Sequence, residues 1–514
     1  MSKTGSAAGS TTRFVVGSLK SKRSRWTRIA IWVLSLAMLA GVGCLGLQAW
    51  QRMESLAASV KRADSLANSA QGRLFTLQKR LSGGASDARG DVLLRLHGSN
   101  TIGDELAPEM ARQWLLALGG SSARVRRDSL QPENIRIQAS FFGEPRPQAV
   151  DVVARGSGVG FEHLVDRSCD LGMSSRPIKD EDLEAFEAVG MLDLAPPASE
   201  HVIGLDAIAV VVHPGNPVAM LSMETLAQLF DGTITDWSQV PGGPQGPVHV
   251  LVRDKKSGTR SFFKDVALHG HEFVETAREF SRHTELVAQV MNDPNAIGFV
   301  SLPFVAKSKA LALRDGSGPP VYPAAFAVRT EDYPLSRRLY LYLPARSTHL
   351  LGREFVEFCL GATGQDVVAK AGFIPLGIEV ARGGEHALDK LPSDLADVLK
   401  RCERLSCTFR FEKDGTLDSR GRRDLDRLQQ ILSGERAGGK VNFIGFCDST
   451  GSPEKDLARS LALAQKVRKE FALHQQSEGA LATLAGGPFL PTASNATPAG
   501  RERNRRVEVW IQPR

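Results

Sequence analysis

The chain has 514 residues, which is enough for two or three domains that each bury a core of their own. Its formal net charge is +7, but residues 1–28 hold seven basic residues and no acidic one, so the excess is mostly confined to that segment. Aromatic residues make up only 6% of the chain and do not interleave with the basic ones, which argues against a nucleic-acid partner.

An uncharged and largely apolar run follows at residues 29–48. As a helix, a run of this length would span about 30 Å, the thickness of a membrane's hydrocarbon core. Because basic residues precede it, residues 1–28 are expected in the cytoplasm, and the bulk of the chain in the periplasm, held to the inner membrane by this single pass. A cleaved signal peptide and a lipoprotein modified at Cys44 are the alternatives.

Residues 49–82 predict a helical stalk. Apolar residues recur at alternating spacings of three and four from Met53 to Leu81, a heptad pattern that predicts a coiled coil and with it a homo-oligomer. The alternative is a single amphipathic helix that packs on its own protein. The pair Gly83-Gly84 then ends the helix and predicts a flexible joint.

Between residues 91 and 378, strand-like apolar runs alternate with helical patterns. The strands are expected at 92–96, 171–173, 207–212 and 248–252. This alternation predicts α/β layers, in which ligands bind at the carboxyl ends of strands.

Three short segments in this region are rich in glycine and hydroxyl residues, at 98–101, 156–160 and 257–259. Each precedes a predicted helix, and helix N-termini offer free N–H donors and partial positive charge to a small oxyanion. Arg253 precedes the third segment and supplies a planar fork for a bidentate contact. The pattern predicts an oxyanion site built on a single arginine.

These segments make the region similar to the PstS-like phosphate-binding periplasmic proteins of ABC transporters. The resemblance includes Gly-Ser-x-Thr at 98–101, Gly-Ser-Gly-x-Gly at 156–160 and Arg-x-x-x-Ser-Gly-Thr at 253–259, with further matches as far as Pro375. It implies an α/β two-lobed periplasmic binding protein of type II, which closes on inorganic phosphate and serves an ABC permease or a membrane sensor. The residues expected to face the anion are Ser99, Thr101, Ser157, Ser175, Arg253, Ser257, Gly258 and Thr259.

One departure from that family concerns selectivity. Some members place an aspartate in the second loop to accept the proton of phosphate, whereas Ser175 stands here with Arg176 beside it. A buried acceptor rejects sulfate, because a lone pair would face a lone pair. Sulfate or another tetrahedral oxyanion therefore remains an alternative to phosphate.

No cofactor, metal or catalytic residue is expected. His269-Gly-His271 lacks a third metal ligand, and no His-Asp pair is spaced to activate Ser257 as a nucleophile. Five cysteines follow the apolar run without zinc-like spacing. An oxidising compartment would permit Cys402 to pair with Cys407, but burial as small hydrophobic side chains is favoured for most of these cysteines.

Residues 379–399 predict a linker, because Arg-Gly-Gly and Pro interrupt the pattern. Residues 400–514 then predict an α+β domain with two helices on one sheet. Strands are expected at 407–411, 441–446 and 506–511.

This last domain is similar to OmpA-like domains through Gly-Phe-Cys-Asp-Ser-Thr-Gly at 445–451 and Gly-Arg-Glu-Arg-Asn-Arg-Arg-Val near the C-terminus. That family binds peptidoglycan through an Asp and an Arg. Asp448 matches the Asp, but Leu463 stands where the Arg is expected, and Arg459 lies one helical turn earlier. Peptidoglycan binding is therefore expected to be weak or to involve Arg501, and a scaffold or dimerisation role is the alternative.

The parts together predict a membrane-anchored periplasmic phosphate-binding protein, docked to peptidoglycan, that captures phosphate for transport or sensing. The alternative is a cell-envelope scaffold whose lobes serve another ligand or none. A phosphate-releasing hydrolase is disfavoured, because neither a metal cluster nor an activated nucleophile is visible in the sequence.

Overall fold

The computed structural model describes residues 91–512 except 192–193, 195–196, 256, 383–390, 413, 434–438 and 475–480. The predicted cytoplasmic segment, membrane anchor and stalk at residues 1–82 lie outside the described residues. Within the described part, no helix combines the length and the apolar character needed to cross a membrane.

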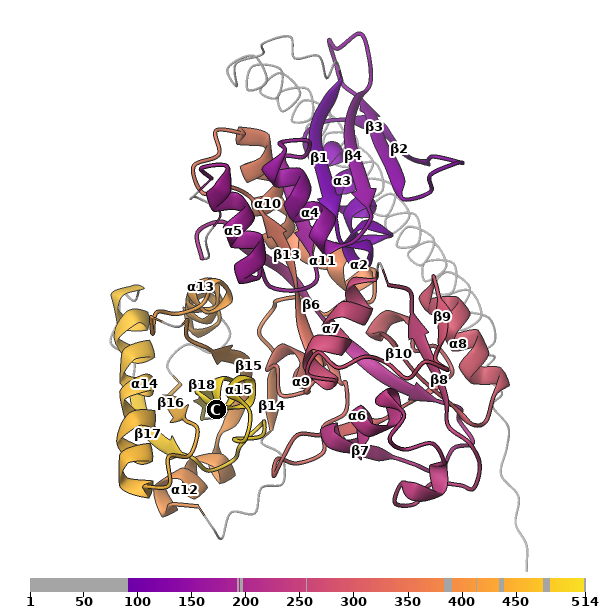
Figure 1. Ribbon diagram of the computed structural model, residues 1–514. Helices are drawn as coiled ribbons and strands as arrows, with labels where there is room; N and C mark the ends of the chain where they lie inside the picture. The colour runs from indigo at the N-terminus through magenta and orange to yellow at the C-terminus, as the bar shows by residue number, and fades with distance from the viewer. Residues whose placement is uncertain are drawn as a thin grey trace, which may run out of the picture. The chain divides into compact units, whose positions relative to one another are not determined.

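Strands of one mixed sheet form the first lobe, in the order β2-β3-β4-β1-β5-β13-β6 (Figure 1). β1 is parallel to both β4 and β5, so the carboxyl ends of these three strands meet at one edge. Helices α3, α10 and α11 pack on the core of this lobe, where Trp114 meets Phe355 edge-on at 5.2 Å between ring centroids. The elements are β1 (Val92–Gly98), α2 (Asn100–Gly103), α3 (Leu106–Ala117), β2 (Ser121–Arg127), β3 (Asn134–Ser140), β4 (Gln148–Ala154), α4 (Ser157–Val165), β5 (Leu171–Ser174), α5 (Asp180–Ala188), α10 (Leu350–Leu360) and α11 (Ala362–Lys370).

Two strands, which we refer to as the hinge strands, connect this lobe to the second. The first, β6 (Glu200–Val212), pairs with β13 (Ser336–Tyr342) over its first half and with β10 (Ala296–Ser301) over its second half. β6 therefore belongs to both lobes. In the register of the two hinge strands, Asp206 lies opposite Arg337.

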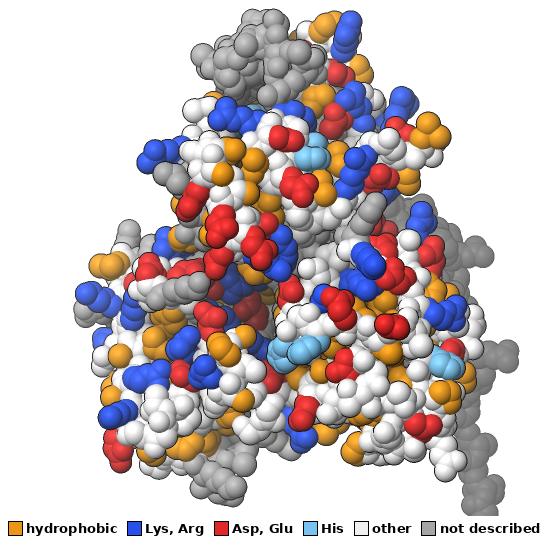
Figure 2. All heavy atoms as spheres, viewed as in Figure 1, with side chains coloured by type: hydrophobic (Ala, Val, Ile, Leu, Met, Phe, Trp, Pro, Cys, Tyr) orange, Lys and Arg blue, Asp and Glu red, His pale blue; other side chains and the backbone are white. Residues whose placement is uncertain are grey.

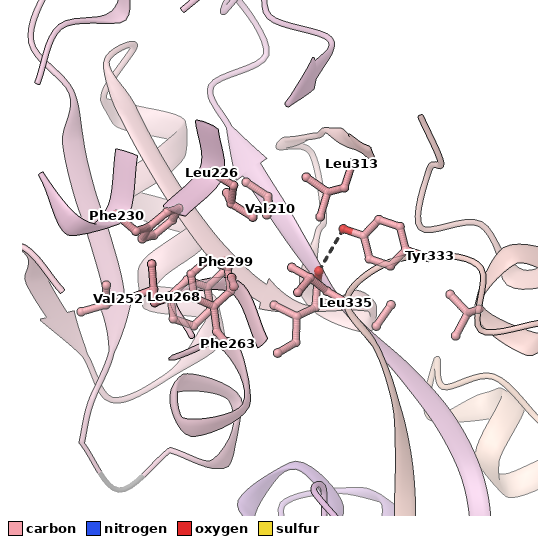
Figure 3. Close-up of a cluster of buried hydrophobic side chains, with 14 of the residues drawn as sticks. Val210, Leu226, Phe230, Val252, Phe263, Leu268, Phe299, Leu313, Tyr333 and Leu335 are labelled. Atoms are coloured by element: carbon pink, nitrogen blue, oxygen red, sulfur yellow. Dashed lines mark hydrogen bonds between the residues drawn. The ribbon is translucent and has the colours of Figure 1, made fainter. Parts of the chain in front are cut away.

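The second lobe is built on strands β6, β10, β8 and β9. Its core stacks aromatic rings from different elements: Phe263 of α7 lies 4.1 Å from Phe299 of β10 with the ring planes 6° apart, and Phe230 of α6 packs beside both (Figure 3). This packing holds α7, whose N-cap and first turn carry three of the predicted site residues. The remaining elements are β7 (Met220–Ser222), α6 (Met223–Asp231), β8 (His249–Arg253), α7 (Gly258–Ala267), β9 (Arg278–Phe280), α8 (His283–Asn292), β11 (Lys309–Ala310), β12 (Ala312–Arg314) and α9 (Ala325–Arg329).

The C-terminal domain, residues 379–512, has a five-stranded sheet in the order β14-β15-β18-β16-β17. Successive side chains of a strand point to opposite faces. On β18, Val507 and Val509 therefore pack with helices α13 and α14, while Trp510 packs with α12 on the other face. The elements are β14 (Val380–Arg382), α12 (Ser393–Arg401), β15 (Glu403–Phe409), α13 (Ser419–Ser433), β16 (Val441–Phe446), α14 (Pro453–His474), β17 (Leu481–Gly487), α15 (Pro498–Asn504) and β18 (Arg506–Ile511).

One expectation about this domain needs correction. The segment 379–399 is not only a linker, because β14 pairs with β15, and Leu395 of α12 packs in the same cluster as Trp510. Of the two options for the cysteines, the disulfide does not form, since Cys402 and Cys407 are both free thiols. Cys407 lies in the core beneath α13 and α14, whereas Cys402 packs on the α12 side, so the two thiols belong to opposite faces of the sheet.

A set of buried charges, which we refer to as the Glu331 cluster, joins the C-terminal domain to β13. It contains four arginines and three carboxylates linked by ion pairs, namely Arg338, Arg410, Arg420, Arg427, Glu331, Asp418 and Asp424. Glu331, just before β13, accepts hydrogen bonds from Arg338 at 2.6 Å, from Arg410 at 2.9 Å and from Arg420 at 3.0 Å. Burial acts to raise the pKa of Glu331, but the three arginines outweigh it and hold that pKa well below its usual range.

Candidate functional site

The three predicted glycine- and hydroxyl-rich segments begin helices α2, α4 and α7, as the sequence indicated. Two of them meet the end of β5. The backbone N–H of Ser175 donates to Ser157 Oγ at 3.1 Å, and a Cβ on Gly258 would lie 2.9 Å from Ser175 Oγ. Ser257 caps α7 by accepting a hydrogen bond from the backbone N–H of Arg260. The second and third segments, one from each lobe, therefore face each other at close range.

Glycine is required where the first and second segments turn away from their strands. Gly98 has a φ of +137°, and a Cβ there would lie 2.1 Å from the carbonyl oxygen of Met173. Gly156, the N-cap of α4, has a φ of 115°. Both positions lie in a region of φ that favours glycine, so the local sequence fixes where these loops leave the sheet.

Arg253 is the last residue of β8, and only 4% of its surface is exposed. Its Nη2 donates to the carbonyl oxygen of Ser281 at 2.7 Å, and its Nε to that of Phe280 at 3.3 Å. Burial lowers the pKa of the Arg253 guanidinium. Backbone carbonyls thus orient this cation, and among the described residues it forms no direct ion pair that would neutralise it.

A second arginine, absent from the predicted site, connects the first and third segments. Arg337 Nη2 donates to Thr101 Oγ1 and to Thr259 Oγ1, each at 3.1 Å. Arg337 also pairs with Asp206 across the hinge strands at 2.7 Å, and both side chains are almost fully buried. The sequence expectation named a single arginine, and the structure places this second guanidinium beside the same loops. The local sequence of β13, Ser-Arg-Arg-Leu-Tyr-Leu-Tyr, does not distinguish Arg337 from the neighbouring Arg338.

Several polar atoms beside these residues have no partner. Ser99 Oγ, Ser175 Oγ and Arg337 Nη1 are buried, and none of them makes a hydrogen bond within the described residues. Buried polar groups are usually paired, so unpartnered ones in a set of converging loops indicate a place for a polar ligand. The set is dominated by hydroxyls, N–H groups and guanidinium groups, which suits a small anion rich in acceptor oxygens.

Other chemistries lack support in the part of the chain that is described. No three His, Cys, Asp or Glu side chains there gather as a metal site. On the face shown in Figure 2, basic and acidic side chains are interspersed rather than gathered by sign. The donor-lined loops are therefore the arrangement with a definite chemical preference, and that preference is for an oxyanion.

In the C-terminal domain, Asp448 is held by two arginines. Arg459 Nη2 donates to Asp448 Oδ1 at 2.8 Å, and Arg505 Nη1 lies 3.9 Å from the same oxygen. Arg501 instead donates to two backbone carbonyl oxygens of the preceding loop. The structure thus brings Arg459, one helical turn before Leu463, to Asp448, whereas no contact among the described residues joins the predicted Arg501 to Asp448.

Two α/β lobes that share hinge strands, with donor-lined loops from both lobes around a buried arginine, define a periplasmic-binding-protein fold. The PBP superfamily domain matches residues 130–363. The phosphate-binding protein PstS of Pseudomonas aeruginosa is 32% identical over 266 residues, which cover 47% of this chain and 78% of that one. The chain belongs to the PstS family, whose members are substrate-binding proteins rather than enzymes.

Two further proteins are similar to this chain. The protein SphX of Synechocystis sp. is 30% identical over 54% of this chain and 82% of its own length. A solved structure of a putative phosphate ABC transporter substrate-binding protein with bound phosphate, from Clostridium perfringens, is 23% identical, covers 55% of this chain and 98% of that chain, and has a TM-score of 0.42. The predicted family is confirmed, and with it the predicted two-lobed fold and the assignment as a binding protein.

Proposed function

We propose that the two lobes bind inorganic phosphate and that this chain is a phosphate receptor of the cell envelope. The observation that carries the proposal is the convergence of hydroxyl and N–H donors from both lobes beside Arg337, whose charge also acts on the buried Arg253. The names of the relatives, which are phosphate-binding proteins, support the same ligand. The proposed contacts are Ser99, Thr101, Ser157, Ser175, Arg253, Ser257, Gly258 and Thr259.

Selectivity between phosphate and sulfate is the open chemical question of this site. Ser175 offers a hydroxyl where some family members have an aspartate, and a hydroxyl can accept a hydrogen bond from protonated phosphate or donate one to sulfate. Titration calorimetry of the full chain with inorganic phosphate and then with sulfate tests the proposal. Binding of phosphate at least tenfold tighter than sulfate is the expected result. Binding of neither anion would favour the second candidate, an envelope scaffold whose lobes have another role.

We further propose that the C-terminal domain is OmpA-like and holds peptidoglycan through Asp448 and Arg459. A carboxylate and a guanidinium at 2.8 Å form a pair that can meet an amine and a carboxylate of a diaminopimelate residue. Arg459 would supply the charge that Leu463 lacks. Co-sedimentation of the full chain with purified sacculi tests this, with Asp448→Ala as the variant expected to lose retention. Leu463→Arg serves as a gain-of-function variant, expected to bind more strongly.

The proposed setting is the inner membrane, with residues 29–48 as a single-pass anchor and residues 49–82 as a stalk that forms a homo-oligomeric coiled coil. A tethered receptor suits local capture of phosphate for a permease or a membrane sensor. Sedimentation of a chain that begins at residue 49 tests the stalk. An oligomer that dissociates in the variant Leu74→Glu with Leu77→Glu is expected, and a monomer would show that the stalk packs on its own protein.

A further inference from the structure

We infer that Arg337 is a second cation of the proposed phosphate site and determines its specificity by polarising one threonine hydroxyl of each lobe toward the anion. The inference rests on the proposed function and goes beyond it, because it assigns a ligand-facing role to a hinge strand rather than to the loops. Its ligand class is a small tetrahedral oxyanion.

The first step concerns how the guanidinium is used. Arg337 Nε and Nη2 donate to Asp206 Oδ2 at 2.9 and 2.7 Å, so the side edge of the guanidinium lies on that carboxylate. One hydrogen of Nη2 is on Asp206, so Thr101 Oγ1 and Thr259 Oγ1 share the other as a bifurcated hydrogen bond. Nη1 is buried and unpartnered among the described residues. The end of the fork, Nη1 and Nη2, therefore lies beside the threonine hydroxyls of the site.

The second step concerns hydrogen-bond polarity. A guanidinium only donates, whereas a hydroxyl has one donor hydrogen and two acceptor positions. Thr101 and Thr259 must therefore accept from Arg337, which leaves the hydrogen of each hydroxyl for another acceptor. Ser157 Oγ likewise accepts a hydrogen bond from the backbone N–H of Ser175, which leaves its own hydrogen for another acceptor. The hydroxyls are thus set as donors before any anion arrives.

The third step concerns what holds Arg337 in place. Asp206 accepts from Ser301 Oγ at 2.8 Å and from the backbone N–H of Leu302 at 3.3 Å, besides its pairing with Arg337. Burial and the charges of Arg253 and Arg337 lower the pKa of the neighbouring His283 well below its usual value. Arg337 is paired with Asp206, whereas Arg253, although it feels the charges of Asp254, Asp104 and Glu285, forms no ion pair among the described residues. An unpaired guanidinium beside the hydroxyls favours an anion there.

The experiment measures the dissociation constant of the full chain for inorganic phosphate by titration calorimetry. Arg337→Gln should weaken binding about 10–100-fold, because a charge-assisted contact and the orientation of two hydroxyls are lost together. Arg176→Gln is the matched control, since Arg176 lies near the same loops but pairs with Asp182 at 2.6 Å. Its affinity should stay within twofold of the wild-type value.

A double-mutant cycle separates this role from a structural one. In the wild-type chain, Thr259→Val should weaken phosphate binding, because it removes a hydroxyl that Arg337 orients. In the Arg337→Gln chain that hydroxyl is no longer oriented, so Thr259→Val should change the affinity little. Ser157→Ala, whose hydroxyl Arg337 does not touch, should instead add its full effect to Arg337→Gln. A purely structural role of Arg337 would treat both hydroxyls alike.

The outcomes of these measurements distinguish failure of the inference from failure of the proposed function. If the wild-type chain binds phosphate and folded Arg337→Gln binds within twofold of Arg176→Gln, the inference is overturned and the proposed function stands. If the wild-type chain binds no phosphate, the proposed function fails and the inference with it. If Arg337→Gln does not fold, Arg337→Lys keeps a cation for Asp206 but lacks the planar fork, and wild-type affinity in that variant overturns the inference.

Discussion

Two buried arginine clusters lie on either side of hinge strand β13 and differ in one respect. In the Glu331 cluster each arginine forms an ion pair with a carboxylate, and the cluster joins the C-terminal domain to the hinge. The cluster between the lobes has two arginines, Arg253 and Arg337, and one carboxylate, Asp206. Successive residues of β13 serve the two clusters, since Arg337 points to the lobes and Arg338 to the C-terminal domain.

The difference teaches how to separate a structural set of charges from a ligand site. Buried charges that pair with one another hold elements together, and removing one partner is expected to be costly. A buried cation without an ion pair, held by backbone carbonyls and surrounded by hydroxyl donors, leaves a charge for an anion from solution. Burial alone does not distinguish the two clusters, but the pairing of their charges does.

The largest expected effect comes from breaking the Glu331 cluster. Glu331→Gln should lower the free energy of unfolding by about 3–5 kcal/mol, because three arginines lose the carboxylate that they share. Urea denaturation followed by circular dichroism measures it. Glu357→Gln is the control, since Glu357 pairs with Arg423 at the surface with 61% and 43% of the side chains exposed. That variant should cost less than about 1 kcal/mol, and equal costs would show that the cluster is not structural.

Removing Arg253 from the cluster between the lobes should weaken ligand binding without lowering the stability of the unliganded chain. Arg253→Ala is expected to weaken phosphate binding by about 2–4 kcal/mol, because a desolvated anion loses a charge-assisted contact. The free energy of unfolding without ligand should hold or rise, since the variant removes a buried charge that lacks an ion-pair partner. Calorimetry and urea denaturation on the same samples check both parts. Unchanged affinity would remove Arg253 from the site.

A fall in pH should change the stability contributed by His97 and by the Glu331 cluster differently. Burial, followed by the charges of His163 and Arg95, lowers the pKa of His97 from 6.5 to about 4. Between these two pH values the unfolded chain binds a proton that the folded chain excludes, so stability falls as pH drops through this window and levels off below it. Glu331, whose pKa is depressed, contributes stability that persists until pH falls well below 4.5.

We therefore expect His97 alone to account for a loss of about 1–2 kcal/mol between pH 6.5 and 4.5, with the Glu331 cluster intact. Denaturant midpoints of the wild-type chain and of His97→Gln at the two pH values measure it. His97→Gln should reduce the dependence by that amount without abolishing it, because the pKa values of His201 and His283 are lowered by burial as well. A pH dependence equal to that of the wild-type chain would assign the effect to another group.

The smallest expected effect tests the close approach of the lobes. Gly258→Ala would place a Cβ 2.9 Å from Ser175 Oγ and 3.3 Å from Ser157 Oγ. Both hydroxyls can rotate away, so the fold should be kept while phosphate affinity falls by about 1 kcal/mol. Gly377→Ala is the control, because nothing lies within 4 Å of the added carbon there. Equal affinity of both variants would place Gly258 outside the site.

The part of the site that was predicted from the sequence is the part built from local signals. Gly98, Gly156 and Ser257 act through their own backbone or cap, so the loop at each helix start could be recognised without tertiary information. Arg337 could not be assigned in this way. Its role depends on Asp206, which lies 131 positions away and reaches it through strand register alone.

In the C-terminal domain, local signals in the sequence led to the wrong expectation. Residues 379–399 contain glycine, proline and charged residues typical of a linker, yet β14 and α12 form there because the sheet and Trp510 offer them a surface. Arg459 was judged by its position along the helix, whereas its long side chain reaches Asp448 from one turn away. Such partners are brought together by tertiary packing, so helix and strand propensity and residue spacing do not reveal them.

The cluster between the lobes also makes the folding equilibrium of this protein a function of its surroundings. A ligand that binds only the folded chain stabilises it by mass action, by about 2.7 kcal/mol at a concentration one hundred times the dissociation constant. For the proposed ligand, melting temperature would then rise with dissolved phosphate. In a phosphate-starved envelope the same chain would unfold, and be degraded, more readily. The buried unpaired charge would thus tie the lifetime of the receptor to the supply of what it captures.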